Sequence, residues 1–534
     1  MRWRLAWFPL FLTIHGACGP AATGGTPSGD TGSGAERGLP ILVDGSFREW
    51  RGLAPAAAGD LGRLWLAHDE RFLFLSFDLG AEINLREGTD LELYLDTDGN
   101  PATGAVAPAM GAELVWRFGD QSGLVARGET TTEVGHAAIG LVTAPTVASS
   151  RFEVALDRKG VEQAAKDGTD LDRVALEGRV GDPPSSGSWR VTLATSGDRL
   201  PAAGPGVRYA FDGPPPLRPP SAPDLGEKQP GALRLLTYNV ERDGLFDPRH
   251  RGAFARILAA VAPDLIAFQE LYEHDAEAAR RAVAAVLGGE WHAAKAGLDL
   301  VVVSRGPILR SQCITYCSEY GSTGAFLIDA GNTLDRRLLL IAVHPPCCTG
   351  GDPPMEVQRQ YVVDATMAYL RDARSPGVAL EVEADTPILI AGDLNLVGDR
   401  QPLDTLLTGE IVHRELGASA APDWDGSPLA DLRPLHTDLP MVFTWFRDSR
   451  RSFSPGRLDF IAYSDSVLRA TKSYVLFTLA MSDETLAANG LERRDTCVSD
   501  HLPVVGDFVP AARTELRSRP ADSPPSRDAP GAAE

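Results

Sequence analysis

The sequence predicts two folded regions of different class, an all-β region followed by a larger α/β domain. Three observations predict this division. Short alternating strands separated by turn residues fill residues 39–211, and apolar strands alternate with helical patterns over 232–511. A proline-rich stretch, 212–231, lies between them. A chain of 534 residues is also too long for a single hydrophobic core, so more than one domain is expected.

The composition narrows the classes of function. The hydrophobic content of 43% is ordinary for a globular protein. The formal net charge of −21 argues against a general nucleic-acid coat protein, because phosphate backbones attract lysine and arginine. The same charge is compatible with an enzyme that gathers phosphate locally through a metal ion.

The N-terminus predicts an export signal over residues 1–17. Two arginines precede an apolar run, 5–14, that is too short to span a bilayer as a helix. Small residues then precede Cys18, which resembles a bacterial lipoprotein cleavage box, although His15 stands where that pattern usually has leucine. We expect either lipid anchoring to the cell envelope through Cys18 or ordinary cleavage and secretion. No later segment is long and apolar enough to span a membrane, so the anchor is the only membrane contact expected.

The first folded region, 39–211, follows a flexible tether, 18–38, which is rich in Gly, Ser, Thr, Ala and Pro. Its segments are short, alternate apolar with polar residues and are bounded by turns, which predicts an all-β sandwich. The expected strands are 63–67, 72–77, 90–95, 113–116, 152–156 and 189–193.

Three loose motifs in this region carry a resemblance. They are Val43-Asp44-Gly45 with Trp50, Trp65 to Asp69, and Leu95-Asp96-Thr97-Asp98-Gly99-Asn100 closing at Thr103-Gly104. The region resembles the carbohydrate-binding module family 9-like sandwiches of secreted bacterial enzymes, which implies a glycan as a possible partner. Asp96, Asp98 and Asn100 offer hard oxygen donors for Ca²⁺, or they form an acidic turn that holds no metal. Tryptophans such as Trp50, Trp65 and Trp116 more often belong to a core than to a sugar platform.

The second folded region, 232–511, follows the semi-rigid linker 212–231 and precedes a tail, 512–534, expected to be disordered. Its apolar strands alternate with helical patterns, as in α/β proteins. The expected strands are 233–240, 264–268, 298–304, 338–343 and 388–391, and the expected helices are 253–261, 276–287 and 355–370.

The stretch Ile388-Leu389-Ile390-Ala391-Gly392-Asp393-Leu394-Asn395 organises this domain. Three large apolar residues and an alanine predict a buried strand, and Gly392 permits a sharp break at its end. Asp393 and Asn395 then leave the strand on one side. Taken alone, they are equally compatible with an Asx turn that has no chemistry.

Other strand ends in the domain carry polar residues too. Burying such groups is costly unless they are paired or used, so a series of them points to one shared site. In chain order the strand-end segments are Thr237-Tyr238-Asn239, Gln269-Glu270, Val343-His344, Gly392-Asp393-Leu394-Asn395, Arg457-Leu458-Asp459-Phe460 and Ser499-Asp500-His501.

In this order the six segments, with Phe443-Thr444-Trp445 ahead of Arg457, resemble the endonuclease/exonuclease/phosphatase superfamily, which includes deoxyribonucleases and sphingomyelinases. The resemblance covers nearly all of 233–509. It implies a four-layer α/β sandwich with two central mixed β-sheets and a site at one rim. It also implies a metal-dependent phosphoric ester hydrolase.

The proposed metal ligands are the carboxylates of Glu270 and Asp500, with Asn239 as a neutral third. These hard oxygen donors suit Mg²⁺ or Mn²⁺. The metal would stabilise charge on the phosphoryl oxygens and on the leaving group.

The catalytic assignments follow from the acid–base character of the other five residues. His501 is expected to be the base, with Asp459 as its orienting carboxylate. Asp393 would position or help deprotonate the attacking water, and Asn395 would hold a phosphate oxygen. His344, where the deoxyribonuclease and sphingomyelinase branches place a second histidine, would protonate the leaving oxygen or stabilise the transition state. The sequence has no serine nucleophile elbow, so direct attack by water is expected.

Five cysteines follow Cys18. In an exported chain they first suggest disulfides, with one cysteine left over. The favoured pairing joins the loop of Cys313 and Cys317 to that of Cys347 and Cys348, and a four-thiolate zinc site is the alternative. Cys497 is the fifth of these cysteines. The sequence does not determine which of the five form disulfides with each other.

Two functions from different classes stay open at this point. One is an exported, monomeric, metal-dependent phosphodiesterase whose sandwich docks it to a glycan or to its own catalytic domain. The other is a surface-binding lipoprotein with an inactive hydrolase domain, and a phosphomonoesterase is a further alternative. The phosphoester substrate could be a nucleic acid, a phospholipid headgroup or a small phosphate ester.

Overall fold

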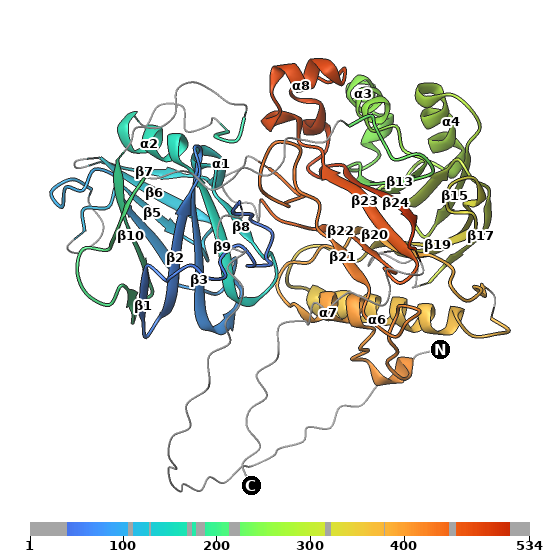
Figure 1. Ribbon diagram of the computed structural model, residues 1–534, viewed down its shortest axis with the longest axis horizontal. Helices are drawn as coiled ribbons and strands as arrows, with labels where there is room; N and C mark the ends of the chain where they lie inside the picture. The colour runs from blue at the N-terminus through green and yellow to red at the C-terminus, as the bar shows by residue number, and fades with distance from the viewer. Residues whose placement is uncertain are drawn as a thin grey trace, which may run out of the picture. The chain divides into compact units, whose positions relative to one another are not determined.

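A computed structural model describes most of residues 40–512 (Figure 1). The expected signal segment, the whole tether with Cys18, most of the linker, and the tail from residue 513 lie outside the described residues. The described residues belong to one compact unit. The described ranges are 40–104, 110–127, 130–167, 174–177, 187–212, 225–314, 322–378, 380–447 and 455–512.

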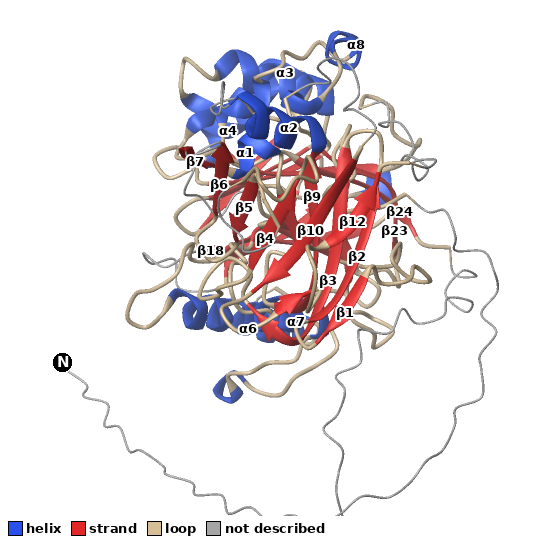
Figure 2. Ribbon diagram, turned by 90° about the vertical axis from the view of Figure 1, so that its left-hand side faces the viewer, coloured by secondary structure: helices blue, strands red, loops and turns tan. Residues whose placement is uncertain are grey.

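Residues 57–210 form two packed antiparallel sheets, which confirms the expected all-β region (Figures 1 and 2). The first sheet has the order β1 (Ala57–Gly59), β2 (Gly62–His68), β3 (Phe72–Ile83), β9 (Ser149–Asp157), β8 (Val142–Ala144). The second has the order β11 (Arg199–Leu200), β10 (Ser188–Ala194), β4 (Glu92–Asp96), β5 (Leu114–Arg117), β6 (Ser122–Arg127), β7 (Thr130–Val134), with β12 (Val207–Ala210) also on β10. Two short helices, α1 (His136–Ile139) and α2 (Arg158–Asp167), accompany them.

Alternating residues of these strands build the sandwich core, which includes Leu75, Leu93, Trp116 and Val154. A strand presents every second side chain to one face, so each sheet buries one apolar set against the other. All three of the tryptophans at positions 50, 65 and 116 are buried, as expected for core residues.

The region from residue 233 to 510 contains two central six-stranded mixed sheets (Figure 1). In the first, β13 and β14 are parallel, and in the second β19 and β20 are parallel, while the other pairs are antiparallel. The first has the order β15 (His292–Ala296), β16 (Leu300–Ser304), β14 (Leu265–Gln269), β13 (Leu233–Asn239), β24 (Val504–Pro510), β23 (Leu468–Val475). The second has the order β17 (Ile308–Cys313), β18 (Ser322–Asp329), β19 (Arg337–His344), β20 (Ile388–Asp393), β22 (Asp459–Tyr463), β21 (Ala430–Leu432).

Helices cover the outer face of each sheet, which completes the expected four layers. On the first sheet, α3 (Arg251–Val261) and α4 (Ala276–Leu287) share a buried cluster with β13 and β14. On the second, α6 (Met355–Ala373) and α7 (Gln401–Thr408) share one with β19 and β20. The short helices α5 (Gly331–Leu334) and α8 (Asp483–Ala488) complete the named helices.

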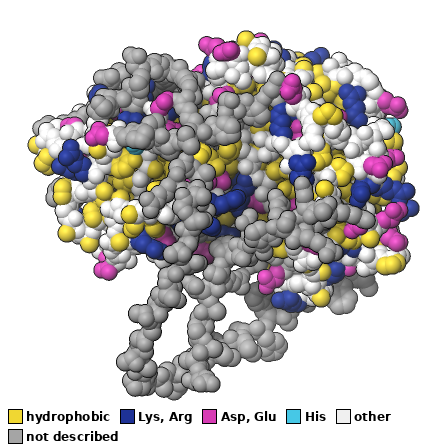
Figure 3. All heavy atoms as spheres, viewed as in Figure 1, with side chains coloured by type: hydrophobic (Ala, Val, Ile, Leu, Met, Phe, Trp, Pro, Cys, Tyr) yellow, Lys and Arg dark blue, Asp and Glu magenta, His cyan; other side chains and the backbone are white. Residues whose placement is uncertain are grey.

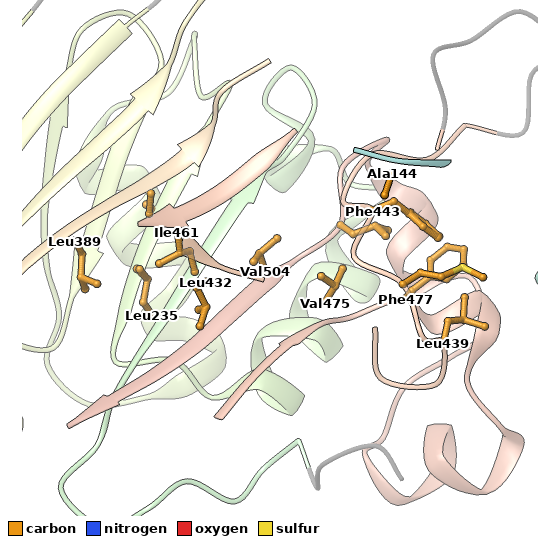
Figure 4. Packing of buried hydrophobic residues seen from close by; sticks show 14 of the residues in the cluster. Ala144, Leu235, Leu389, Leu432, Leu439, Phe443, Ile461, Val475, Phe477 and Val504 are labelled. Atoms are coloured by element: carbon orange, nitrogen blue, oxygen red, sulfur yellow. The ribbon is translucent and has the colours of Figure 1, made fainter. Parts of the chain in front are cut away.

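A third apolar cluster lies between the two sheets. It contains Leu235 of β13, Leu389 of β20, Ile461 of β22 and Val504 of β24, all with essentially no exposed surface (Figure 4). Strands buried on both faces are apolar almost throughout, which is why the stretch 388–391 was recognisable as a strand.

The predicted elements recur with small boundary shifts. The predicted helix 276–287 has the observed bounds, and the predicted strand 298–304 begins two residues later, at Leu300. The expected strands did not include β15, β17 and β18, nor β21, β22, β23 and β24. The first three have exposed or glycine-containing stretches that lack a clear apolar period. Val43 was expected at the start of the sandwich, but it forms a parallel bridge with Met441 of the α/β domain.

Several backbone contacts join the sandwich residues to loops of the α/β domain. Ala148 N donates to the Gly398 carbonyl at 2.7 Å, and Arg457 N donates to Thr146 Oγ1 at 2.8 Å. Gly398 follows β20, which ends at Asp393, and Arg457 precedes β22, which begins at Asp459. Both contacts of the sandwich therefore lie close to strand ends that carry predicted site residues.

Acidic and basic side chains are interspersed over the face seen in Figure 3. Within the described ranges, no helix combines the length and the apolar character needed to cross a bilayer.

Candidate active site

The predicted site residues lie at the ends of neighbouring strands. Asn239 ends β13, His344 ends β19, Asp393 ends β20, and Asp459 begins β22 beside it. Parallel strands bring their carboxyl ends to one edge, and the antiparallel β22 brings its first residue to that edge. The chain approaches closely here. A Cβ on Gly392, whose φ is 149°, would lie 2.0 Å from the Val343 carbonyl oxygen, so only glycine fits.

Asn239 joins the residues of the two sheets. Its amide nitrogen donates to Glu270 Oε1 at 3.0 Å and to Asp393 Oδ2 at 3.2 Å. Its side-chain oxygen, Oδ1, accepts from Glu241 N at 3.0 Å. Glu270 follows β14 with a φ of 65°, and its Oε2 accepts from Arg242 N at 2.9 Å. A neutral amide thus separates two carboxylates that would otherwise repel each other.

His501 lies between two buried carboxylates. Its Nδ1 is 2.9 Å from Asp459 Oδ2, and its Nε2 is 3.4 Å from Asp393 Oδ2. The Ser499 hydroxyl supports the segment, since it accepts from His501 N and donates to the Asn239 carbonyl. The structure therefore brings Asp459 and His501 together as a dyad that faces Asp393.

His344 forms a second dyad with a residue that the sequence did not single out. Its Nδ1 is 2.5 Å from Asp299 Oδ2, and its Nε2 is 3.5 Å from Asp393 Oδ2. Asp299 Oδ2 also accepts from Glu270 N at 3.1 Å. Asp299 was placed inside the predicted strand 298–304, where a buried carboxylate is costly unless it is paired. An aspartate within a predicted buried strand was therefore the sequence signal that could have identified Asp299 as a site residue.

The charges of the two dyads shift the pKa values of the site. Burial alone would lower the pKa of each histidine, but Asp299 raises that of His344 to about 9, and Asp459 with Asp393 raises that of His501 to about 10. Burial raises the pKa of Asp393 to about 6, against the opposing effect of His501. At neutral pH the two imidazoles are therefore protonated and the Asp393 carboxyl is largely ionised.

Asp500 and Asn395 have different surroundings from those expected. Asp500 Oδ2 accepts from Arg447 Nε and Nη2 at 2.9 and 2.7 Å, and Arg447 also donates to Glu241 at 2.6 Å. Asn395 donates its side-chain amide to the Pro345 carbonyl at 3.0 Å, which leaves one of its two amide hydrogens for a ligand.

Two acidic groups near the site could hold a cation. Ligand atoms of Asp393, Asp459 and His501 lie within 4.8 Å of one another, but both His501 nitrogens face carboxylates and carry protons, so this group behaves as a hydrogen-bonded dyad. Glu270 and the Asn239 amide oxygen are hard donors near the more exposed edge, and their chemistry fits a divalent cation.

The observed disulfides differ from the predicted cysteine pairing. Cys347 and Cys348 form a disulfide with each other, three residues beyond His344, so the expected bridge between their loop and that of Cys313 is wrong. Cys313 is also disulfide-bonded, and Cys317 lies outside the described residues. These bonds leave too few thiolates for the alternative four-thiolate zinc site. Neighbouring cysteines were read as one end of a longer bridge, because adjacent residues seldom pair.

Comparison with known protein families identifies the family of the second domain. Residues 236–501 match the Endonuclease/Exonuclease/phosphatase family, and this domain belongs to it. The family consists of phosphoester hydrolases. No curated protein matches the chain.

Solved structures give a likeness of fold alone. TDP2 of D. rerio, in complex with a single-stranded DNA product, is 16% identical, with 52% of this chain and 98% of that chain covered at a TM-score of 0.34. Sphingomyelinase C from Streptomyces griseocarneus is 15% identical, with 52% and 99% covered at 0.33. The human Nocturnin catalytic domain with bound sulfate is 17% identical, with 53% and 95% covered at 0.34. Likenesses at these values carry no argument about the substrate of this chain.

Proposed function

We propose that the chain is an exported, metal-dependent phosphodiesterase that hydrolyses its substrate by direct attack of water. One observation carries the proposal. Two histidines, each bonded to its own carboxylate, direct their Nε2 atoms at the same Asp393 oxygen from 3.4 and 3.5 Å. This arrangement offers two proton donors and one acceptor around a single point, which suits the in-line displacement of a leaving oxygen.

His344 is the proposed acid that protonates the leaving oxygen. Its raised pKa keeps the proton on the ring at neutral pH, and Asp299 stabilises the imidazolium. His501 was expected from the sequence to be the base. Since its pKa is raised to about 10, Asp393, with a pKa near 6, is better matched to accept a proton from water, while His501 stabilises negative charge.

Glu270 and Asn239 are the residues that would hold Mg²⁺ or Mn²⁺, with Asp500 as the third proposed ligand. The ion would supply charge stabilisation to the phosphoryl oxygens and the leaving oxygen. Asp500 Oδ2 is bonded to Arg447, so this oxygen must exchange its partner before it can become a ligand.

A diester is favoured over a monoester because a dianionic terminal phosphate requires several cationic side chains. Arg447 is bonded to Asp500 and Glu241, and Arg457 is bonded to Asp431, so both guanidiniums already have carboxylate partners. His344 provides the proton that an expelled alkoxide needs.

The test is the rate on bis(p-nitrophenyl) phosphate against p-nitrophenyl phosphate with Mg²⁺, for wild type and His344→Ala, and on an unactivated dinucleotide. The matched control is His413→Ala, because His413 pairs with buried Asp364 at 2.7 Å outside the site. We expect a preference for the diester and a loss on the dinucleotide only in the His344 variant. A preference for the monoester, or full dinucleotide activity in His344→Ala, contradicts the proposal.

The competing function, a binding lipoprotein with an inactive hydrolase domain, would show no turnover at all. Plasmid DNA, sphingomyelin and phosphomonoesters tested side by side, with and without Mg²⁺, separate the substrate classes and this alternative. The buried tryptophans of the sandwich are unavailable as sugar platforms, which favours a role for the sandwich on its own catalytic domain. Export, either with a lipid anchor at Cys18 or by ordinary secretion, and a monomeric state stay part of the proposal.

A calcium ion in the sandwich is the weaker part of the cofactor prediction. Asp96 Oδ1 accepts from the backbone of Asp98 and Gly99, Asp96 Oδ2 pairs with Arg190, and Asp98 accepts from Thr103. These bonds are those of a self-contained acidic turn. Calorimetry of the whole protein with Ca²⁺ decides the matter, because heat that disappears in Asp98→Asn would establish the site.

A further inference from the structure

Arg359, in the first half of α6, is buried with 1% of its surface exposed. Its guanidinium donates from Nη1 to the carbonyls of Pro346 and Cys348, at 3.0 and 2.8 Å, and from Nη2 to the carbonyl of Val397 at 2.8 Å. Its carboxylate neighbour, Glu356, lies 3.6 Å away on the preceding turn. Three backbone carbonyls are thus the main partners of a buried cation, which ties the position of the backbone to this side chain.

The three carbonyls belong to the two loops that carry catalytic residues. Pro346 and Cys348 follow His344 at the end of β19, and Val397 follows Asp393 at the end of β20. The loops are also bonded to each other, because Asn395 donates to the Pro345 carbonyl at 3.0 Å. Arg359 therefore bonds to both loops, at positions within a few residues of His344 and Asp393.

The disulfide between Cys347 and Cys348 lies inside the first of these loops. A bond between neighbouring residues restricts the backbone between them, and Cys348 has a φ of 72°, which non-glycine residues adopt only when the surroundings impose it. The carbonyl of this restricted residue is one of the acceptors of Arg359. The disulfide and the guanidinium therefore both restrain the short segment from Pro346 to Cys348.

We propose that Arg359 is a positioning residue of the active site, which together with the Cys347–Cys348 disulfide fixes His344 and Asp393 relative to each other. The inference rests on the proposed function for its effect on turnover, and on geometry alone for its effect on the loops. Loss of the guanidinium leaves three carbonyls without their donor, so both loops gain freedom. Displacement of catalytic groups by about 1 Å lowers turnover by up to about a hundredfold, with little effect on substrate binding.

The test compares Arg359→Met with Arg374→Met in the full chain. Arg374 is the matched control, because it follows the same helix and donates to three backbone carbonyls, those of residues 421–423, away from the site. Hydrogen exchange by mass spectrometry is read on peptides covering 344–349 and 393–398, and kcat and KM are measured on bis(p-nitrophenyl) phosphate. For Arg359→Met we expect faster exchange in both peptides and a fall in kcat of at least about tenfold, with KM within about twofold. For Arg374→Met we expect neither change.

Unchanged exchange in Arg359→Met, or faster exchange with wild-type kcat, overturns the inference. If Arg359→Met does not fold, Arg359→Lys replaces it. Its single nitrogen cannot occupy the positions of both Nη1 and Nη2, so it should give intermediate exchange and kcat. The double variant Cys347→Ser, Cys348→Ser should speed exchange in 344–349 and lower kcat, and a wild-type result there removes the disulfide from the proposal. A wild-type protein without diesterase activity refutes the proposed function, while the exchange measurements still decide whether Arg359 fixes the loops.

Discussion

Asp299→Asn gives the sharpest test of the acid–base assignment. Asp299 is 2.5 Å from His344 and is the main reason that the pKa of this buried histidine rises from 6.5 to about 9, against the opposing effect of burial. A rise of about 2.5 units corresponds to about 3 kcal/mol of preference for the imidazolium. The asparagine keeps the size and removes the charge, so the pKa of His344 must fall.

A lower pKa of His344 in Asp299→Asn should change the pH dependence of both activity and stability in a defined direction. If His344 gives the proton, kcat/KM declines above about pH 9 in the wild type, and Asp299→Asn moves this alkaline limb to lower pH. The raised pKa also stabilises the fold fully below pH 6.5, and this contribution is lost as the pH rises through about 9. The variant should therefore lose more unfolding free energy at pH 6 than at pH 10.

The assays are a pH profile of kcat/KM and urea unfolding at these two pH values. Asp364→Asn is the control, because it removes the carboxylate of the His413 pair, which lies outside the site. It should leave the alkaline limb in place. An alkaline limb that stays near pH 9 in Asp299→Asn would refute the assignment of His344 as the acid, and equal destabilisation at both pH values would refute the electrostatic reasoning.

Three further changes test other parts of the site. Glu270→Ala should abolish Mg²⁺-dependent hydrolysis and keep the thermal unfolding transition, and retained activity with the same metal dependence would remove Glu270 from the metal site. Asp459→Asn should lower kcat strongly with little change in KM, and adding His501→Ala should cost no more than His501→Ala alone; additive losses would mean that the two do not act as a unit. Thr146→Val removes the acceptor of the buried Arg457 N–H and should cost about 1–3 kcal/mol of unfolding free energy, so an unchanged urea midpoint would deny the sandwich a supporting role.

Much of the fold and most of the candidate site residues were visible in the sequence for one main reason, the cost of burying polar groups. The stretch 388–391 is apolar because β20 is buried on both faces, and Asp393 stands out at its end for the same reason. The helix 276–287 was recognisable because its apolar face is a local feature, and the structure adds Asp275 as its N-cap. Asn239 was found in the same way, at the end of an apolar run, whereas His501 lies ahead of β24 and was found through the segment Ser499-Asp500-His501.

What the sequence could not supply is the partner of each polar group. Asp299 is 45 residues from His344, and the two meet because β16 and β19 belong to different sheets whose ends converge at the site. Arg447 reaches Asp500 and Glu241, which are separated by more than 250 residues in the chain. Such meetings follow from strand order and loop geometry, and no local pattern encodes them.

The amino-acid sequence by itself determined that the protein has an all-β region before an α/β domain, and that polar residues lie next to the ends of apolar strands in that domain. Only the tertiary structure decided that two histidine–carboxylate pairs face one aspartate, that Arg359 holds the loops behind them, and that Cys347 bonds to Cys348. The physical reason is that secondary structure and burial depend on the chemistry of neighbouring residues, whereas pKa values and hydrogen-bond partners depend on which distant strand ends the packed sheets bring within about 3 Å.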